Sequence, residues 1–223
     1  MTPPPRGGGV KWHLESLTPG CRETARRLGE SPRMGAFYLA GGTALALAYG
    51  HRVSVDLDFF SSTNPLGFVE RQALLEDFRK CGMEVEEEKD GTVHGRHKAT
   101  HVSFFRYPNP LLRPVRLWDR LRVAHPVDIG LMKLGAIIGR GSRKDFIDLY
   151  FILERELSLA RLLRLIPRKF PGRRDVRVQA LRALVYFADA DAEPPPKVAA
   201  SLSWARVKAF FEREVRSLAR KLS

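Results

Sequence analysis

The sequence predicts an α+β protein in which a mixed β-sheet with flanking helices is followed by a C-terminal helical bundle. Two patterns predict this order. Between residues 36 and 106, short apolar runs with the two-residue alternation of strands are interrupted by glycines and polar turns. From Pro126 onward, the apolar residues recur at helical spacing. We therefore predict a disordered lead-in rich in Pro and Gly (1–10), an α/β core (11–125) and a helical domain (126–223).

The elements expected in the core alternate between helices and strands. Helices are expected at 11–30, 43–50 and 65–81, and strands at 36–40, 53–60, 83–89, 91–97 and 100–106. Thr43 is expected to cap the second helix, which ends at Gly50. Alternation in the second strand predicts that Val53 and Val55 lie on its apolar face.

The helical domain is expected to be a series of amphipathic segments. Helices are predicted at 126–141, 142–156, 158–169, 174–188 and 203–221, with a loop at 189–196. Ser142 and Asp145 have the spacing of a capping box, which gives Asp145 a structural explanation at the start of a helix. Asp148 lies one turn further along the same face, beyond the cap, and is the better candidate for a functional role.

Charge is distributed unevenly along the 223 residues, whose formal net charge is +13. Residues 1–110 contain 14 Lys/Arg and 13 Asp/Glu, whereas residues 111–223 contain 24 and 12. A basic half of this kind attracts polyanions such as nucleic acid. The amino-acid usage of a GC-rich genome explains the excess equally well, because Arg far outnumbers Lys.

The remaining composition indicates a cytoplasmic protein that does not associate with membranes. No apolar run is long enough to span a bilayer, and the N-terminus lacks the apolar core of a signal peptide. Cys21 and Cys81 fit neither a disulfide framework nor a zinc motif.

The most informative pattern is a Gly41-Gly42-Thr43 turn followed by Asp56-Leu57-Asp58. Carboxylates at i and i+2 of a strand share one face, and Mg²⁺ binds one or two carboxylates together with substrate phosphates. Two such ions can clamp the attacking and leaving oxygens of a phosphoryl displacement. A Gly-Gly turn at the start of a helix lets backbone N–H groups approach a phosphate. We therefore expect a triphosphate between the turn and the strand.

Each half of this pattern also has a simpler explanation. Gly-Gly is usually only a turn, and Asp-x-Asp is common on solvated strands. Here Val, Leu and Phe flank the two acids, so solvent exposure explains them poorly. Buried like charges are costly without a cation. We therefore favour a magnesium site, with Mn²⁺ as the alternative ion.

The segment LAGGTALALAYGHRVSVDLDFF (39–60) resembles the signature of the AbiEii/AbiGii toxin-type nucleotidyltransferases, a branch of the DNA polymerase β-like superfamily. LMKLGAIIGRGSRKDFIDLYFIL (131–153) resembles the second conserved block of that family, and a looser likeness covers most of 36–212. The resemblance implies a nucleotidyltransferase-like sheet and the transfer of a nucleotidyl group from an NTP to an acceptor hydroxyl. It further implies RNA, and tRNA in particular, as the acceptor. Because members commonly act as toxins of toxin–antitoxin or phage-defence pairs, it also implies an antitoxin protein as partner.

The same resemblance assigns roles to individual residues. It implies that the nucleotide is bound by Gly41, Gly42, Thr43, Arg52 and Ser54. It implies that the catalytic residues are Asp56, Asp58, Lys133 and Asp148, and that the first two also bind the metal. Taken without the resemblance, Lys133 has a second explanation as a lysine whose stem packs among apolar neighbours while its amine reaches water.

One expected feature is missing. Related polymerases supply a third carboxylate from a neighbouring strand, but the strand expected to carry it, Thr100–Pro108, offers Ser103 or His101 and no acid. Asp148 is one substitute, and the gap also leaves room for a catalytically inactive NTP- or RNA-binding protein of the same fold.

Two further alternatives concern the acceptor. In a small-molecule nucleotidyltransferase the acceptor is often cationic, so the basic half counts against this function. A cluster of cations in the helical domain either grips an RNA backbone or forms solvated helix faces. Its members are Arg161, Arg164, Arg168, Lys169, Arg173, Arg174 and Arg177.

Overall fold

The computed structural model describes residues 11–198 and 202–220, and the predicted lead-in at 1–10 lies outside them. Within this part of the chain, a seven-stranded mixed sheet has the order β3-β4-β5-β2-β1-β7-β6. The β2/β5 and β1/β7 pairs are parallel, and the other neighbouring pairs are antiparallel. The strands are β1 (Tyr38–Ala40), β2 (Leu57–Ser61), β3 (Glu84–Lys89), β4 (Thr92–His97), β5 (Thr100–Arg106), β6 (Arg116–Trp118) and β7 (Leu121–Val123).

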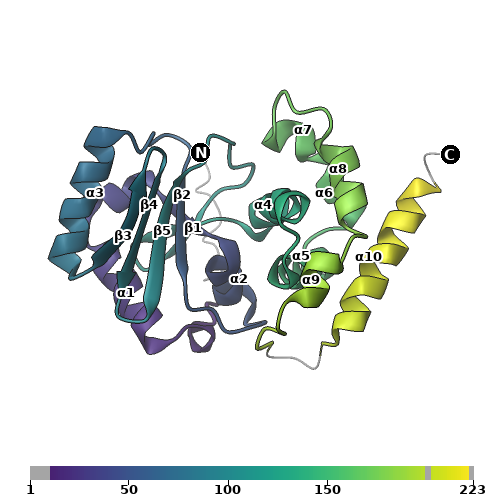
Figure 1. Ribbon diagram of the computed structural model, residues 1–223, viewed down its shortest axis with the longest axis horizontal. Helices are drawn as coiled ribbons and strands as arrows, with labels where there is room; N and C mark the ends of the chain where they lie inside the picture. The colour runs from purple at the N-terminus through teal and green to yellow at the C-terminus, as the bar shows by residue number, and fades with distance from the viewer. Residues whose placement is uncertain (1–10, 199–201, 221–223) are drawn as a thin grey trace, which may run out of the picture.

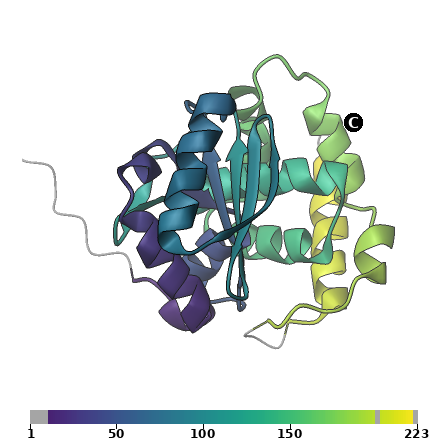
Figure 2. The ribbon, with the colours of Figure 1, turned by 60° about the vertical axis from the view of Figure 1, so that its left-hand side comes forward.

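Helices cover both faces of this sheet. Figure 1 shows α1 and α3 on one face and α2 between the other face and α4 and α5, with α10 at the outer edge. Figure 2 shows α1 and α3 beside each other in front of the sheet. This arrangement confirms the predicted α+β class. The helices are α1 (Pro19–Gly29), α2 (Gly41–Tyr49), α3 (Phe68–Cys81), α4 (Pro126–Gly139), α5 (Arg143–Arg155), α6 (Leu159–Arg164), α7 (Ile166–Lys169), α8 (Val176–Ala183), α9 (Ala188–Ala192) and α10 (Trp204–Ala219), with 3-10 turns η1 (Leu14–Ser16) and η2 (Pro32–Ala36).

The apolar interior consists of two clusters of buried side chains. The first fills the space between the sheet and its helices, where the ring of Phe104 packs against those of Phe37, Phe59 and Phe78 with centroids 5.0–5.7 Å apart. The second lies among the C-terminal helices. Ile152 of α5 belongs to the first cluster, so the C-terminal helices also pack on the sheet side. The division of the chain into domains at residue 125 remains a prediction.

Several expected boundaries need correction. The helix predicted from residue 11 begins at Pro19, because the Thr18 side chain caps it by accepting from the Cys21 N–H at 3.2 Å. The helix predicted at 158–169 is two helices, and Pro167, which lacks an N–H, lies in the first turn of the second. The helix predicted at 174–188 ends at Ala183. The predicted loop at 189–196 starts inside α9, which has acids in the first turn that the helix N-terminus favours.

The strand predicted at 53–60 begins only at Leu57. The N–H of Ser54 donates to Ser16 O at 2.9 Å and that of Val53 to Lys197 O at 3.4 Å, so this stretch pairs with segments outside the sheet. Val53 and Val55 are 46% and 42% exposed, and their predicted burial is wrong. The two-residue alternation correctly predicted which face the side chains near Asp58 occupy. It could not predict which segments the backbone of Val53 and Ser54 would pair with.

Two further differences lie near the turns. Helix α2 begins at Gly41 with Ala40 at its N-cap, so Thr43 lies inside the helix and is not the predicted cap. The β6–β7 hairpin, which continues the sheet beyond β1, was not expected, because strands of three residues give too little alternation to detect. Among the described helices, none is long and apolar enough to cross a membrane.

Candidate active site

The turn between β1 and α2 places the glycine pair against charged side chains. Gly41 has a left-handed φ of +66°, a conformation that favours glycine. A Cβ on Gly41 would lie 2.9 Å from Asp58 Oδ2, and one on Gly42 would lie 1.9 Å from Arg52 Nη2. Both positions therefore favour glycine, because the turn packs directly on a carboxylate and a guanidinium.

Thr43 connects helix α2 to the segment that precedes β2. Its buried Oγ1 is hydrogen-bonded to Ser54 Oγ at 2.8 Å and to the carbonyl oxygen of Asp56. These bonds hold the backbone of Asp56 against α2. The triphosphate contact expected of Thr43 remains a prediction.

The two acids lie where β2 begins. Asp58 lies in β2 opposite Ala40 of β1 and Ser103 of β5. Asp56 directly precedes the strand. Burial, together with the charge of Asp56, raises the pKa of the Asp58 carboxyl. The charges of Lys133 and Arg140 offset this rise only in part, so a cation bound at Asp58 would favour the ionised carboxylate.

Behind these acids, a buried charge cluster joins α4 and α5 to the segment before β2. The Asp148 carboxylate accepts from Arg52 Nε at 2.8 Å, Arg52 Nη2 at 3.0 Å and His51 Nε2 at 2.7 Å. Lys133 Nζ lies 2.7 Å from Asp148 Oδ2 and 2.7 Å from Asp145 Oδ1. Although burial opposes its ionisation, Lys133 and Arg52 hold the pKa of Asp148 well below its usual range. The Asp148 carboxylate therefore fixes the positions of these cations.

Asp145 connects the same cluster to solvent-accessible space. Its carboxylate accepts from Arg140 Nε and from Ser142 Oγ, each at 3.0 Å. The Ser142 hydroxyl thus donates to the Asp145 side chain, which corrects the predicted capping box, although α5 begins where expected. Asp145 lines both cavities of the site, whereas Asp148 is fully buried behind them.

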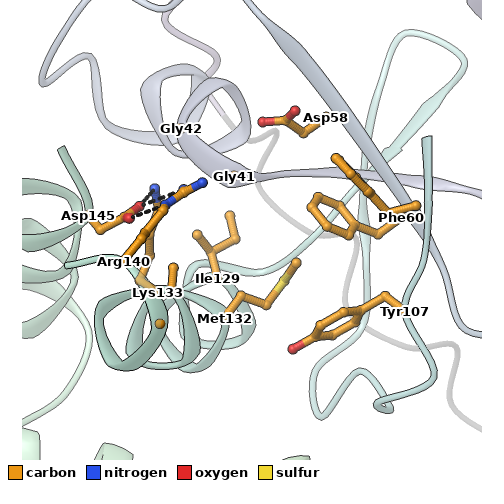
Figure 3. A pocket seen from close by; sticks show the side chains of 13 residues that line it. Gly41, Gly42, Asp58, Phe60, Tyr107, Ile129, Met132, Lys133, Arg140 and Asp145 are labelled. Carbon is orange, nitrogen blue, oxygen red and sulfur yellow. Dashed lines mark hydrogen bonds and ion pairs between the residues drawn. The ribbon is translucent and has the colours of Figure 1, made fainter. Parts of the chain in front are cut away.

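Two cavities meet at Asp58. The aromatic cavity, of about 410 Å³, has a polar end and an apolar wall (Figure 3). The polar end includes Gly41, Gly42, Asp58, Lys133, Arg140 and Asp145, and the wall includes Phe60, Phe105, Tyr107, Ile129 and Met132. The polar cavity, of about 530 Å³, is lined by Arg52, Ser54, Asp56, Asp58, Lys133, Arg140, Ser142, Lys144, Asp145 and Glu193, among others. Of the predicted site residues, Gly42, Asp58 and Lys133 line both cavities.

The neighbour of β2 is the strand expected to carry a third carboxylate. Ser103 of β5 lies opposite Asp58, and its hydroxyl is 2.9 Å from His94 Nδ1 of β4. His101 is exposed and lies 3.2 Å from Glu86. Asp148 is not available as a substitute, because three cationic or N–H-donating side chains surround its carboxylate.

The sequence interpretation assigned neither the aromatic wall nor Arg140 to the site, although an ion pair of Arg140 with Asp145 or Asp148 fitted the sequence and the pair with Asp145 forms. The wall has a detectable signal, since Phe60 and Phe105 lie two residues beyond Asp58 and Ser103 and therefore share their face. Arg140 is the C-cap residue of α4, and its Nε bonds Asp145, five residues further along the chain, at 3.0 Å. One predicted member of the basic cluster is wrong: Lys169 is fully buried, and its Nζ bonds Asp128 Oδ1 at 2.9 Å and Pro110 O at 2.7 Å.

Comparison with known proteins places this geometry in context. The model of the family described as nucleotidyl transferase AbiEii toxin, type IV TA system, matches residues 25–221. An uncharacterized protein of Aquifex aeolicus is 35% identical over 185 residues, covering 81% of this chain and 86% of that protein. The structure of JHP933 from Helicobacter pylori is similar with a TM-score of 0.50 and 18% identity, covering 90% and 89% of the two chains. That of MenT4, a nucleotidyltransferase toxin from Mycobacterium tuberculosis, gives 0.53 and 16%, covering 89% and 84%.

The mixed sheet, the glycine turn beside paired aspartates and the adjoining helices define a nucleotidyltransferase-like α+β protein. The chain belongs to the AbiEii nucleotidyl transferase toxin family.

Proposed function

We propose that the protein transfers a nucleotidyl group from an NTP to a hydroxyl of an RNA acceptor, with Asp56 and Asp58 holding magnesium. The observation that carries this proposal is the junction of the two cavities at Asp58. A polar cavity beside an aromatic cavity suits an NTP, which has a charged triphosphate and a planar nucleobase. Family membership supports the same chemistry.

The polar cavity suits the triphosphate. It offers the amide-rich turn at Gly42 and the cations Arg52, Lys133, Arg140 and Lys144. Lys133 is buried and is fixed by two carboxylates, so its amine is oriented before the substrate arrives.

The aromatic cavity suits the nucleobase. The rings of Phe60 and Phe105 stack at 5.1 Å, and Tyr107 meets Phe60 edge-on at 5.7 Å. Ile129 and Met132 of α4 line the same cavity (Figure 3). Such a slot holds a planar base between apolar surfaces.

The residues present fit a magnesium ion. Among the described residues, no group of three or more His, Cys, Asp or Glu side chains is placed to hold a metal. A Mg²⁺ ion on Asp56 and Asp58 would therefore take its remaining ligands from phosphates and water, which is its usual preference. When bound, it would neutralise charge on the phosphoryl group. Mn²⁺ has the same ligand preference and is the alternative ion.

RNA as acceptor is supported by exposed cations on the helical side. Arg161, Arg164, Arg168, Arg173, Arg174 and Arg177 are exposed, unlike Lys169. Such a surface attracts a phosphate backbone.

Membership of a toxin–antitoxin family supports an antitoxin protein as the partner that restrains the activity. We propose a cytoplasmic location in keeping with this role.

The test is incubation of the protein with magnesium or manganese, each labelled NTP in turn and total RNA, beside Asp56→Ala/Asp58→Ala. Glu154→Ala, which removes an exposed acid of α5, is the matched control. We expect labelled RNA with wild type and control, and none with the double variant. Magnesium-dependent NTP binding without labelled RNA would indicate an inactive binder or a small-molecule acceptor. Absence of both binding and labelling would overturn the proposal.

A further inference from the structure

A row of polar side chains crosses four neighbouring strands and ends at Asp58. Glu87 of β3 lies opposite His94 of β4, His94 opposite Ser103 of β5, and Ser103 opposite Asp58 of β2. His94 Nδ1 is 2.9 Å from Ser103 Oγ, and His94 Nε2 is 3.8 Å from Glu87 Oε2. This cross-strand row, Glu87–His94–Ser103–Asp58, has the order carboxylate, imidazole, hydroxyl, metal-binding acid.

The row lies on the side of Asp58 from which an acceptor must approach. This step rests on the proposed function, in which the triphosphate lies against the glycine turn that follows β1. In-line displacement puts the attacking oxygen opposite the leaving pyrophosphate. Asp58 has β1 on one side and β5 on the other, so the attacking oxygen approaches on the side of Ser103.

We propose that Ser103 contacts the acceptor hydroxyl and that His94 receives its proton through Ser103. The O–H bond of the acceptor breaks, and its oxygen forms a bond to the α-phosphorus. The bond between the α-phosphorus and the oxygen that bridges it to the β-phosphorus breaks, so pyrophosphate leaves with the electron pair. The proton passes to Ser103 Oγ while the Ser103 proton passes to His94 Nδ1. Glu87, across from His94 Nε2, stabilises the resulting imidazolium.

Two other candidates, Asp148 and His101, are poorer proton acceptors. The Asp148 carboxylate is already bonded to Arg52, His51 and Lys133. His101 lies on the same strand as Ser103, but its Nδ1 faces Glu86 at 3.2 Å and its side chain is 57% exposed. His94, by contrast, also packs edge-on against Phe105 of the aromatic wall, with ring centroids 5.4 Å apart.

The charged surroundings of His94 come from three strands. From β3, Glu87 faces it, and Lys89 Nζ in turn bonds Glu87 at 2.8 Å. From β5, Ser103 and Phe105 contact it, and Asp58 of β2 lies beyond Ser103. A protonated imidazole thus has two carboxylates nearby, while the neutral form is the one that accepts a proton.

The test compares His94→Asn and His94→Ala with Ser103→Ala and with His101→Asn. Asparagine can keep a hydrogen bond to Ser103 but cannot take up the proton. We expect His94→Asn to lower kcat about 10²-fold or more while KM for the NTP stays within about 2-fold, because general bases contribute roughly 10²–10⁴-fold. Wild-type kcat should fall on acidification, and this fall should be shallower in His94→Asn. His101→Asn should retain the wild-type rate and slope.

Each outcome decides the inference separately from the proposed function. If wild type labels RNA, Asp56→Ala/Asp58→Ala does not, and His94→Asn keeps the wild-type kcat and pH profile, then the inference is wrong while nucleotidyl transfer stands. The inference is equally wrong if His101→Asn shows the loss instead. A His94→Asn rate that equals wild type together with an inactive His94→Ala would reduce His94 to a structural hydrogen-bond partner of Ser103. If wild type itself is inactive, the failure belongs to the proposed function.

Discussion

Two pairs of aspartates lie close to the cavities of this protein, and their surroundings are opposite. Asp56 and Asp58 line the polar cavity, and burial beside Asp56 raises the pKa of Asp58. In the second pair, Asp145 and Asp148, Asp148 is sealed from solvent among Arg52, His51 and Lys133, and its pKa is lowered. Lys133 and Arg140 offset the rise at Asp58 only in part, so the first pair suits a bound cation, whereas Asp148, saturated by cations, holds the fold in place.

The largest expected effect concerns activity and the first pair. Asp58→Asn should lower nucleotidyl transfer by about 10³-fold or more, since it removes a negative ligand at the reacting phosphate. Its free energy of unfolding should stay the same or rise, because repulsion from Asp56 is lost. Initial rates with labelled NTP and urea unfolding measure the two effects. A large fall in the free energy of unfolding would show that Asp58, like Asp148, stabilises the fold.

The second pair should respond in the opposite way. Asp148→Ala leaves Arg52 buried without a carboxylate partner and Lys133 with Asp145 alone, so the free energy of unfolding should fall by about 3–5 kcal/mol. Urea unfolding followed by circular dichroism measures the loss. Glu154→Ala, an exposed change on the same helix, should shift it by no more than about 0.5 kcal/mol. Equal stability of the two variants would contradict the structural role of Asp148.

Acid should weaken the second pair specifically. The pKa of Asp148 is lower folded than unfolded, so its contribution to stability is fully present above the unfolded value of about 3.9 and is lost as pH falls through the folded value. The unfolding free energy of wild type should therefore decline below about pH 4. Asp148→Asn should show a shallower decline in urea titrations from neutral to acid pH. Parallel curves for the two proteins would refute this linkage.

A smaller effect is expected at the turn that lies between the two pairs. Gly42→Ala would push its Cβ against Arg52 Nη2, and should cost about 1–3 kcal/mol as the guanidinium shifts away from Asp148. Gly135→Ala in α4, which would meet only the Phe170 ring at 3.8 Å, is the control and should be neutral or stabilising. Thermal unfolding distinguishes them. Equal melting temperatures would show that Arg52 can move without cost.

The sequence identified the parts of the site that are local in the chain. Asp58 follows from alternation along β2, whereas Asp56 lies just before the strand; the Gly-Gly turn follows from its position before an apolar helix. The strands β3, β4 and β5 were also placed within about a residue, because each begins or ends at a turn with Gly or Lys. These features depend on neighbours a few residues away.

The rest of the site depends on contacts that join distant segments. The sequence could not predict that the Val53 N–H bonds the Lys197 carbonyl. Nor could it predict that Lys169 bonds Asp128, since nothing local distinguishes a buried lysine from a solvated one. Asp145 illustrates the same limit. Its spacing from Ser142 matched a cap, but the packing of α4 on α5 brings Lys133 to it instead.

The link between Arg52 and Asp148 also has a consequence for how the protein is made. The two residues are 96 positions apart in the chain, so a nascent chain emerging from the ribosome carries Asp56 and Asp58 long before Asp148 arrives to neutralise Arg52. Val198, which pairs with Arg52 as an isolated bridge, is translated later still. Unfinished translation products therefore lack the completed charge cluster, which forms only in molecules whose synthesis has almost ended.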